Sequence, residues 1–264
     1  MAIRFQILGS SSAGNCALLV TEDCHILIDA GFSGRRIGQL LGANGYSIDA
    51  IDAVFLTHEH SDHATGLTGL SRKPHLQFFA NHGTAQAVQG KLKRPANWRI
   101  FETGSSFRFR DLEIEAFSIP HDAYDPVGFV FTQGGDTLFT PRRSVAWCVD
   151  LGYVSQLVRE RVRAAQILVL ESNHDHRLLD DDPHRPWSVK QRIKGRHGHL
   201  SNEAALEFLD SEKTPHWENV YLAHLSRDCN DVALVEEQFN RNGTRDYSVT
   251  VVDPLAAALP AMEI

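Results

Sequence analysis

Four side chains of types that commonly bind metal ions lie within six consecutive positions of this chain. They are His58, His60, Asp62 and His63, which form the pattern H-x-H-x-D-H directly after an apolar run. In an extended or tightly turned segment, residues two apart point the same way, so His58 and His60 can bind one ion together. The turn that follows can direct Asp62 and His63 toward a second ion. Imidazole and carboxylate ligands suit borderline divalent metals such as zinc or manganese.

Three further candidates for metal binding are spread along the rest of the chain. His121, Asp150 and His224 each come after a run that is predicted to be a strand. A site built at one edge of a sheet needs its side chains at such strand ends. An aspartate there can instead cap a turn or a helix, and a helix is predicted at 152–165, so that alternative stays open for Asp150.

Together these seven side chains are sufficient for a two-metal centre with a shared water. We expect two divalent ions, zinc or manganese, and the same ligands also accept iron. The predicted grouping is His58, His60 and His121 for one ion, Asp62, His63 and His224 for the other, and Asp150 as a bridge between them.

The elements that must position these residues follow an order typical of layered α/β proteins. Strands and hairpins come first, and strands then alternate with helices, which predicts two sheets packed face to face with helices outside. We expect one domain over 1–264 with a basic insertion around 180–199. Strands are predicted at 3–8, 17–20, 25–28, 53–57, 77–80, 112–118, 128–131, 144–149, 167–170, 220–223 and 248–252, and helices at 34–41, 83–92, 152–165, 202–209 and 232–242.

Composition excludes several classes of protein. The start of the chain lacks a secretion signal, and no apolar run approaches the roughly 20 residues that span a bilayer, so we expect a cytoplasmic protein without membrane contact. The four cysteines are widely spaced and form no C-x-x-C pair, which predicts reduced thiols. A net charge of -7 disfavours indiscriminate nucleic-acid binding but allows a local basic groove. Nothing in the sequence predicts the oligomeric state.

The metal pattern resembles the metallo-β-lactamase superfamily, whose fold is a four-layer αββα sandwich. Longer strings resemble the branch of YycJ (WalJ)-type exonucleases within it. In the string at 224–230, Asp228-Cys229 departs from the usual Glu-Asn, which puts local contacts in doubt. The strings are LGSSSAGNC at 8–16, LESNHD at 170–175, KQRI at 190–193, GHLSN at 198–202 and HLSRDCN at 224–230.

The resemblance implies a phosphodiesterase, and specifically a 5′-to-3′ DNA exonuclease in which a metal-bridging hydroxide attacks the phosphodiester. The residues assigned to catalysis are Asp62 as a metal ligand, His199 as the donor of a proton to the leaving alkoxide, and Glu171 as a group that orients ligands. Asp29 and His174 are further candidates for orienting ligands. His199 could instead be only the neighbour of a helix cap, and both alternatives stay open.

Substrate binding is predicted for two segments. In the Gly/Ser-rich turn at 9–15, hydroxyls and amides could hold a phosphate. In the basic stretch 185–196, cations could grip a DNA strand while Trp187 stacks on a base. A solvated helix face, balanced by the acids at 180–182, is the alternative for that stretch. The predicted substrate-binding residues are Ser11, Asn15, Lys190, Arg192, Ser201 and Asn202.

Two other functions compete with the nuclease. A small-molecule metallo-hydrolase, such as a thioesterase, lactonase or cyclic phosphodiesterase, would share the metal chemistry but would use a closed apolar pocket instead of a long basic groove. A non-catalytic protein could keep a metal for stability, although structural zinc sites usually have four ligands.

Overall fold

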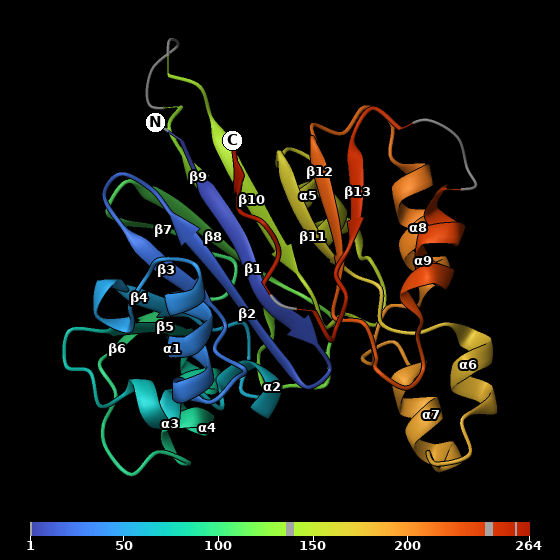
Figure 1. Ribbon diagram of the computed structural model, residues 1–264, viewed down its shortest axis with the longest axis horizontal. Helices are drawn as coiled ribbons and strands as arrows, with labels where there is room; N and C mark the ends of the chain where they lie inside the picture. The colour runs from blue at the N-terminus through green and yellow to red at the C-terminus, as the bar shows by residue number, and fades with distance from the viewer. Residues whose placement is uncertain (1, 136–139, 241–244, 257) are drawn as a thin grey trace.

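The computed structural model describes residues 2–135, 140–240, 245–256 and 258–264 (Figure 1). Within these ranges, the chain forms two seven-stranded sheets. The first sheet has the order β14-β1-β2-β3-β4-β5-β6, and the second β13-β12-β11-β10-β9-β8-β7. The four-layer αββα sandwich predicted from the sequence is confirmed.

The first sheet contains β1 (Arg4–Ser11), β2 (Gly14–Val20), β3 (His25–Ile28), β4 (Ala53–Phe55), β5 (Gln77–Asn81), β6 (Trp98–Phe101) and β14 (Met262–Glu263). The second contains β7 (Ser106–Phe109), β8 (Leu112–Ser118), β9 (Val127–Gln133), β10 (Arg143–Cys148), β11 (Ile167–Glu171), β12 (Asn219–Ala223) and β13 (Ser248–Val251). The helices are α1 (Gly34–Ala43), α2 (Ser61–Ala64), α3 (Leu67–Leu70), α4 (His82–Gln89), α5 (Gln156–Val162), α6 (His176–Asp181), α7 (Trp187–Ile193), α8 (Asn202–Ser211) and α9 (Val232–Asn240), with a 3-10 turn η1 (Ile48–Ala50).

The core lies in three layers. Between the sheets, rings such as Phe5, Phe55, Phe129 and Trp147 are buried together. A second apolar layer joins the outer face of the first sheet to α1, α3 and α4, and a third joins the second sheet to α5, α8 and α9. Each fully buried large apolar side chain stabilises the fold by roughly 1.5–3 kcal/mol, so both sheets are held to each other and to their helices.

Each sheet contains a run of parallel strands. Strands β3 to β6 are parallel in the first sheet, and β10 to β13 are parallel in the second. The carboxyl ends of parallel strands meet at one edge of their sheet, which is where ligands bind in open α/β proteins. Six of the seven metal-ligand candidates follow β4, β10 or β12. His121 follows β8, which runs in the same direction as β10 because both pair antiparallel with β9. The fold therefore brings all seven to such edges.

Several element bounds differ from the expectation. Strands β1 and β2 extend to Ser11 and begin at Gly14, so the hairpin turn is only Ser12 and Ala13. The helix expected at 152–165 is the shorter α5, because the side chain of Ser155 accepts the hydrogen bond of Val158 N and begins the helix there. The last two residues of the helix expected at 232–242 lie outside the described residues.

Seven short elements are not predicted by the sequence patterns, namely β6, β7, β14, α2, α3, α6 and α7. Strand β6 has two exposed residues in succession, so it lacks the alternation of a half-buried strand. All four cysteines are buried and unpaired, as expected. None of the helices in the described ranges combines the length and apolar character needed to cross a membrane.

Candidate metal centre

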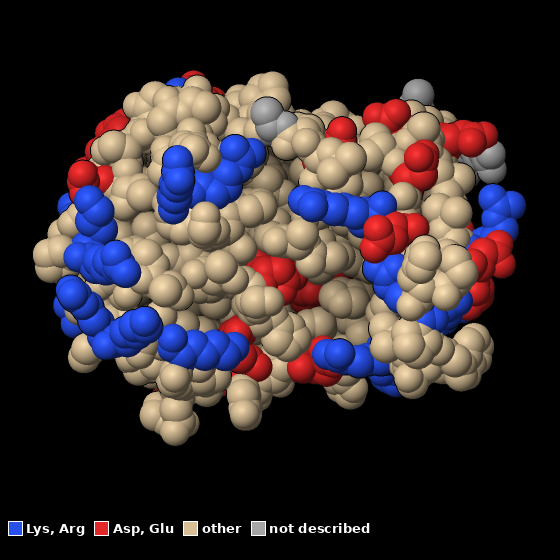
Figure 2. Space-filling view, turned by 60° about the horizontal axis from the view of Figure 1, so that its bottom comes forward, with Lys and Arg blue, Asp and Glu red and all other residues tan. Residues whose placement is uncertain are grey.

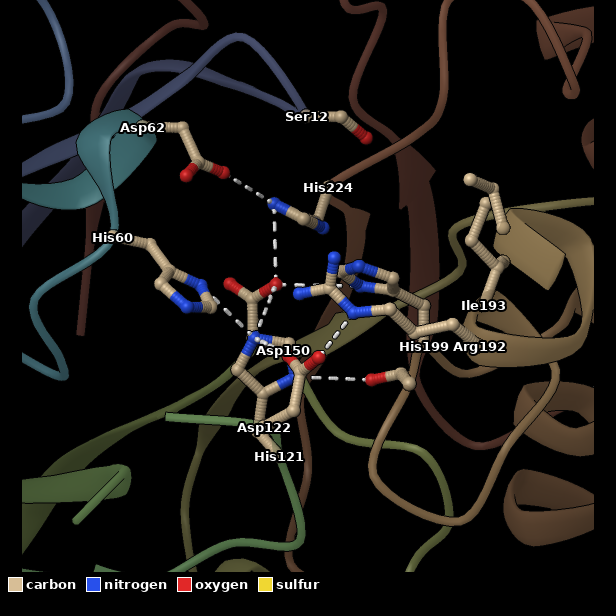
Figure 3. A pocket seen from close by; sticks show the side chains of 12 residues that line it. Ser12, His60, Asp62, His121, Asp122, Asp150, Arg192, Ile193, His199 and His224 are labelled. Carbon is tan, nitrogen blue, oxygen red and sulfur yellow. Dashed lines mark hydrogen bonds and ion pairs between the residues drawn. The ribbon is translucent and has the colours of Figure 1, made fainter. Parts of the chain in front are cut away.

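Acidic side chains gather in a hollow between the two halves of the molecule (Figure 2). The hollow corresponds to a pocket of about 270 Å³. Its lining comes from both sheets and from α7, as Figure 3 shows. The lining residues are Ser12, His60, Asp62, His121, Asp122, Asp150, Val189, Arg192, Ile193, Gly198, His199 and His224.

The first group of predicted ligands comes together on one side of this pocket. Possible ligand atoms of His58, His60 and His121 all lie within 4.8 Å of one another. His60 Nδ1 is 3.3 Å from His121 Nε2. Because His58 and His60 come from the loop after β4 and His121 from the loop after β8, one ion at this position would join the two sheets.

The second group contains Asp62, His63, Asp150 and His224, whose ligand atoms also lie within 4.8 Å of one another. His63 Nε2 is 2.7 Å from Asp150 Oδ2, and His224 Nε2 is 3.4 Å from Asp62 Oδ2. The other oxygen of Asp150 lies 3.7 Å from His121 Nε2, in the first group. Asp150 therefore touches both groups, and Figure 3 shows it between His60, His121 and His224.

The chemistry of these side chains fits a divalent cation. Nε2 of His58 is fully buried and has no hydrogen-bond partner among the described residues. A buried polar atom of this kind is costly unless something binds it. A cation among the imidazoles and carboxylates satisfies that nitrogen and neutralises the acids. The clustered side chains thus form a divalent-metal site.

The protonation states are consistent with this role. Burial lowers the pKa of His58 and of His121, so both are neutral, the form that binds metal. Burial opposes the charged form of His224 as well, but the carboxylates of Asp150, Asp62 and Glu171 outweigh it and raise the pKa of His224 to about 10. The negative field that protonates His224 is the field that would attract a cation.

Asp29 and Thr57 orient two of the histidines. Asp29 Oδ2 accepts a hydrogen bond from His63 Nδ1 at 2.8 Å, which leaves Nε2 of His63 facing the second group. Thr57 Oγ1 lies 3.0 Å from His58 Nδ1 and also donates to Asp29. Asp29 was predicted to orient ligands, whereas Thr57 was not, although its position directly before His58 was a usable signal.

Glu171 performs the corresponding task for His224 and His199. Its Oε1 accepts hydrogen bonds from His224 Nδ1 at 2.7 Å and from His199 Nδ1 at 2.8 Å. The other oxygen accepts from the backbone N–H groups of Leu151 and Leu200. Although burial alone would raise it, the pKa of Glu171 is lowered to about 2, chiefly by His199.

His199 lies at the edge of the pocket with 24% of its side chain exposed. Its Nδ1 is bound to Glu171, so its Nε2 is the nitrogen left to meet a substrate. Burial works against the charged form, but Glu171 raises the pKa of His199. The helix cap is Ser201, whose Oγ accepts from Ala204 N. His199 therefore precedes a cap and also lines the pocket.

Three residues of the site have a left-handed backbone. The φ angles are 58° for Asp29, 62° for Asp150 and 59° for His224. Each residue follows a parallel strand closely, namely β3, β10 or β12. This conformation costs a non-glycine residue roughly 1–2 kcal/mol, and such strain gathers at functional sites. The sharp turn redirects each side chain toward the other ligands.

Two glycines allow the backbone to close around the centre. A Cβ on Gly31 would stand 1.7 Å from the carbonyl oxygen of Asp62, and one on Gly198 would stand 2.1 Å from the carbonyl oxygen of Ile193. The carbonyl of Gly198 in turn lies 3.0 Å from His121 Nδ1. The loop after α7 thus orients a metal ligand as well as carrying His199.

The structure does not bring most of the predicted substrate-binding residues to the pocket. Ser11 is paired with Gly14 in the β1–β2 hairpin and is buried, whereas its neighbour Ser12, at the turn, lines the pocket. Asn15 is buried, and its Nδ2 lies 3.1 Å from the Ser11 carbonyl and from His63 Nε2. Ser201 caps α8, and Asn202 is buried against Ser172 and Asn230.

The basic stretch is mostly engaged in contacts within the protein. Lys190 is buried and donates to the carbonyl of Asp180 at 2.7 Å. Lys194 pairs with Asp180, and Arg185 pairs with Asp182 and Asp228. Among the lysines and arginines of this stretch, Arg192 lines the pocket, and it pairs with Asp122 across the mouth.

Trp187 is 66% exposed but faces away from the pocket. Val189, Arg192 and Ile193 line the pocket at the i, i+3 and i+4 spacing of one helix face. Trp187 precedes Val189 by two residues, or about 200° around the helix. The structure therefore does not place this ring where a base in the pocket could stack on it.

Comparison with known proteins agrees with the geometry. Residues 25–224 match the family model of the beta-lactamase superfamily domain. The chain is 35% identical over 232 residues to the protein named exodeoxyribonuclease YycJ of Bacillus anthracis, covering 87% of this chain and 85% of the relative. It is 35% identical over 235 residues to exodeoxyribonuclease WalJ of Streptococcus pneumoniae, covering 87% and 84%. The metallo-beta-lactamase fold protein YhfI of Bacillus subtilis superimposes with a TM-score of 0.73 at 15% identity over 99% of each chain, which shows a shared fold.

Proposed function

We propose that this chain, which belongs to the beta-lactamase superfamily and is a metal-dependent hydrolase, removes nucleotides from DNA in the 5′-to-3′ direction. The observation that carries the proposal is the convergence of seven ligand side chains in two groups joined by Asp150, at the floor of an open pocket. The names of the relatives support DNA as the substrate. The polarity follows from the resemblance of the sequence strings.

Two divalent ions, zinc or manganese, are proposed to occupy the two groups. When bound, such ions activate a water and neutralise the charge that develops on a phosphodiester. The protein holds the ligands in place through Asp29, Thr57 and Glu171, each of which touches a ligand histidine. Titration of the metal-free protein should therefore reach two equivalents of metal.

His199 is proposed to donate a proton to the leaving oxygen. Glu171 holds its Nδ1, which leaves Nε2 on the side of the pocket. Its placement beside Asp150 puts it next to the reacting phosphate in this scheme. A donor matters most when the leaving group is a poor one, such as the alkoxide of a deoxyribose.

Arg192 is the proposed phosphate contact. Its guanidinium lies at the mouth of the pocket, is 67% exposed, and pairs with Asp122. A guanidinium binds phosphate oxygens through two parallel hydrogen bonds. An entering phosphate can therefore take the place of the Asp122 carboxylate.

The test uses end-labelled DNA strands bearing either a 5′-phosphate or a 5′-hydroxyl, with manganese- or zinc-loaded protein. We expect stepwise release of nucleotides from the 5′ end by the wild type and none by Asp150→Asn. Turnover of thioesters, lactones or cyclic phosphodiesters in place of DNA would overturn the nuclease and support the small-molecule alternative. Release from the 3′ end would overturn the polarity alone.

The role of His199 has its own test. We expect His199→Gln to lower kcat on DNA by about 10²-fold, the usual size of a general-acid contribution. The same variant should lose far less activity on a phosphodiester whose leaving group is p-nitrophenolate. This leaving group is stable as an anion and departs without receiving a proton. Equal losses on both substrates would mean that His199 only positions Glu171 and His224.

A further inference from the structure

A second group of basic side chains lies on the N-terminal half of the molecule. We define the N-terminal basic rim as Arg35, Arg36, Arg72, Lys91, Lys93 and Arg94. Most lysines and arginines of that half stand along its outer side, around the acidic hollow (Figure 2). All six rim residues are exposed. In the described part of the chain, only Lys91 among the six has a side-chain hydrogen bond, and none forms an ion pair.

The rim borders a groove of about 160 Å³ between α2–α3 and α4. The groove begins at the segment 58–63, here called the metal-binding loop. Successive side chains at 59–62 point alternately into the groove and into the pocket. His60 and Asp62 line the catalytic pocket, whereas Glu59 and Ser61 line the groove. The remaining lining residues are Ala64, Thr65, Thr68, Val88, Lys91 and Leu92.

Lys91 ties the groove to the metal-binding loop. Its ammonium donates to the carbonyl of Glu59 at 3.2 Å, which leaves two of its three protons for a ligand. One oxygen of the Glu59 carboxylate, Oε1, accepts a hydrogen bond from Tyr124 N, and the other is buried. Ser61, Thr65 and Thr68 line the same groove as Lys91. The Thr65 hydroxyl already donates to the Ser61 carbonyl, so the hydroxyls of Ser61 and Thr68 and the Lys91 ammonium are the donors left for a ligand. This set of donors suits an anion with several oxygens.

The rest of the rim continues from the groove on both sides. Arg72 lies in the turn directly after α3, the helix that carries Thr68. Lys93 and Arg94 follow Lys91 after one intervening residue, Leu92. At the far end, α1 packs on α3 so closely that a Cβ on Gly34 would lie 3.3 Å from Gly69 Cα, which places Arg35 and Arg36 next to α3.

We propose that the groove and the N-terminal basic rim bind backbone phosphates of the nucleic-acid strand beyond the bond that is cleaved. This inference rests on the proposed nuclease function and adds the path of the substrate to it. The chain as a whole carries a charge of -7. Six exposed cations without acidic partners therefore form a local positive patch that can attract a nucleic-acid strand to this side of the molecule. A strand that leaves the metals past His60 and Asp62 meets the groove on the other side of the same loop.

The experiment compares two double variants that remove the same charge. Lys93→Gln/Arg94→Gln alters the rim. Arg142→Gln/Lys213→Gln is the control, because both residues are exposed and precede the starts of β10 and β12, at the sheet edge opposite the metals. Affinity for a labelled 12-nucleotide single strand is measured by fluorescence anisotropy over a range of salt, with Asp150→Asn added to each protein so that the strand stays intact.

We expect the rim variant to bind about tenfold more weakly than its parent near 0.1 M salt. The slope of log affinity against log salt should become shallower by about 1, since each phosphate contact on a single strand contributes about 0.7. The control should match the parent both in affinity and in the slope of log affinity against log salt. In active protein, the ratio of kcat/KM for the 12-mer to that for a dinucleotide should fall toward 1 in the rim variant only.

Equal weakening in the control, or an unchanged affinity and slope in the rim variant, would overturn the groove assignment. The two proposals fail in different ways. A wild type that binds DNA through the rim but hydrolyses none would overturn the nuclease alone. A wild type that cleaves DNA with no dependence on the rim would overturn this inference alone. Thermal unfolding of both variants establishes that they fold.

Discussion

The basic stretch at 185–196 and the N-terminal basic rim carry similar charge but use it differently. In the basic stretch, Arg185 and Lys194 form ion pairs, and Lys190 is buried on a backbone carbonyl. In the rim, no cation has an ion-pair partner within the described residues. A cation whose charge is already satisfied stabilises the fold, whereas one without an acidic partner remains available for a phosphate.

The basic stretch still contributes to the site through geometry. Its helix α7 supplies Val189, Arg192 and Ile193 to the pocket, and the loop after it carries Gly198 and His199. The ion pairs of Arg185 link this segment to Asp182 and to the loop that follows β12. Anchoring therefore explains Arg185, Lys190 and Lys194, whereas Arg192 pairs with Asp122 at the mouth of the pocket.

The strongest test of this difference separates Arg192 from Lys190. We expect Arg192→Ala to raise KM for DNA about tenfold, because a charge-assisted phosphate contact is lost. Lys190→Ala should leave KM unchanged but lower the free energy of unfolding by about 1–2 kcal/mol, through loss of the hydrogen bond to Asp180. Steady-state kinetics and urea unfolding measure the two effects. Equal KM changes would show that Lys190 also binds substrate.

Arg185 tests whether the ion pairs of the basic stretch are anchors. Arg185→Ala leaves Asp182, whose side chain is only 5% exposed, without its cation. We expect the thermal midpoint to fall by about 3 °C, with KM for DNA changed less than by Arg192→Ala. Differential scanning calorimetry gives the midpoint. A large KM increase at an unchanged midpoint would place Arg185 in the substrate path.

Buried His174, near the basic stretch, should make the free energy of unfolding depend on pH. Burial, and then the nearby His176, lower the pKa of His174 to about 4. The unfolded chain, with an ordinary pKa near 6.5, binds the proton first, so stability is lost as the pH falls from 6.5 toward 4. The effect is on the order of 1 kcal/mol per pH unit. We expect His174→Phe to flatten the unfolding free energy over this range relative to wild type. An unaltered slope would contradict the assignment.

The smallest effect is expected at the exposed end of the Arg185 network. Asp228 pairs with Arg185 at 2.8 Å, but its side chain is 68% exposed. Exposed ion pairs contribute little because water and salt screen them. Asp228→Asn should therefore keep the thermal midpoint within about 1 °C of wild type. A loss as large as that of Arg185→Ala would show that both acids are needed to anchor the segment.

Sequence patterns predicted a structural feature well where a single short segment contains all the residues that define it. The spacing of His58, His60, Asp62 and His63 was visible because all four lie within six positions shortly after buried β4, in the loop and in the one-turn helix α2 that follow it. His121, Asp150 and His224 were predicted because each followed an apolar run. Strand β6 and the one-turn helices α2 and α3 were missed, because such short elements show no usable periodicity.

The substrate contacts were harder to predict because they depend on direction and pairing. Ser11 and Ser12 are adjacent in the sequence, yet the hairpin turn buries one and places the other in the pocket. Likewise, Lys190 and Arg192 are two residues apart on α7 but face α6 and the pocket respectively. Sequence gives the charge of such a residue but not the partner that neutralises it.

By itself, the sequence determined the layered fold and which side chains are candidates for metal binding, because apolar runs and the side chains that follow them can be read from local positions. The sequence also predicted two groups joined by Asp150 and orienting roles for Asp29 and Glu171. Only the tertiary structure showed that Thr57 contacts His58, and which nitrogen of His63 and of His224 each carboxylate binds. It also decided which cations are satisfied and which are available. The reason is that pairing of charges is a property of distances between segments, and those distances exist only once both sheets have packed.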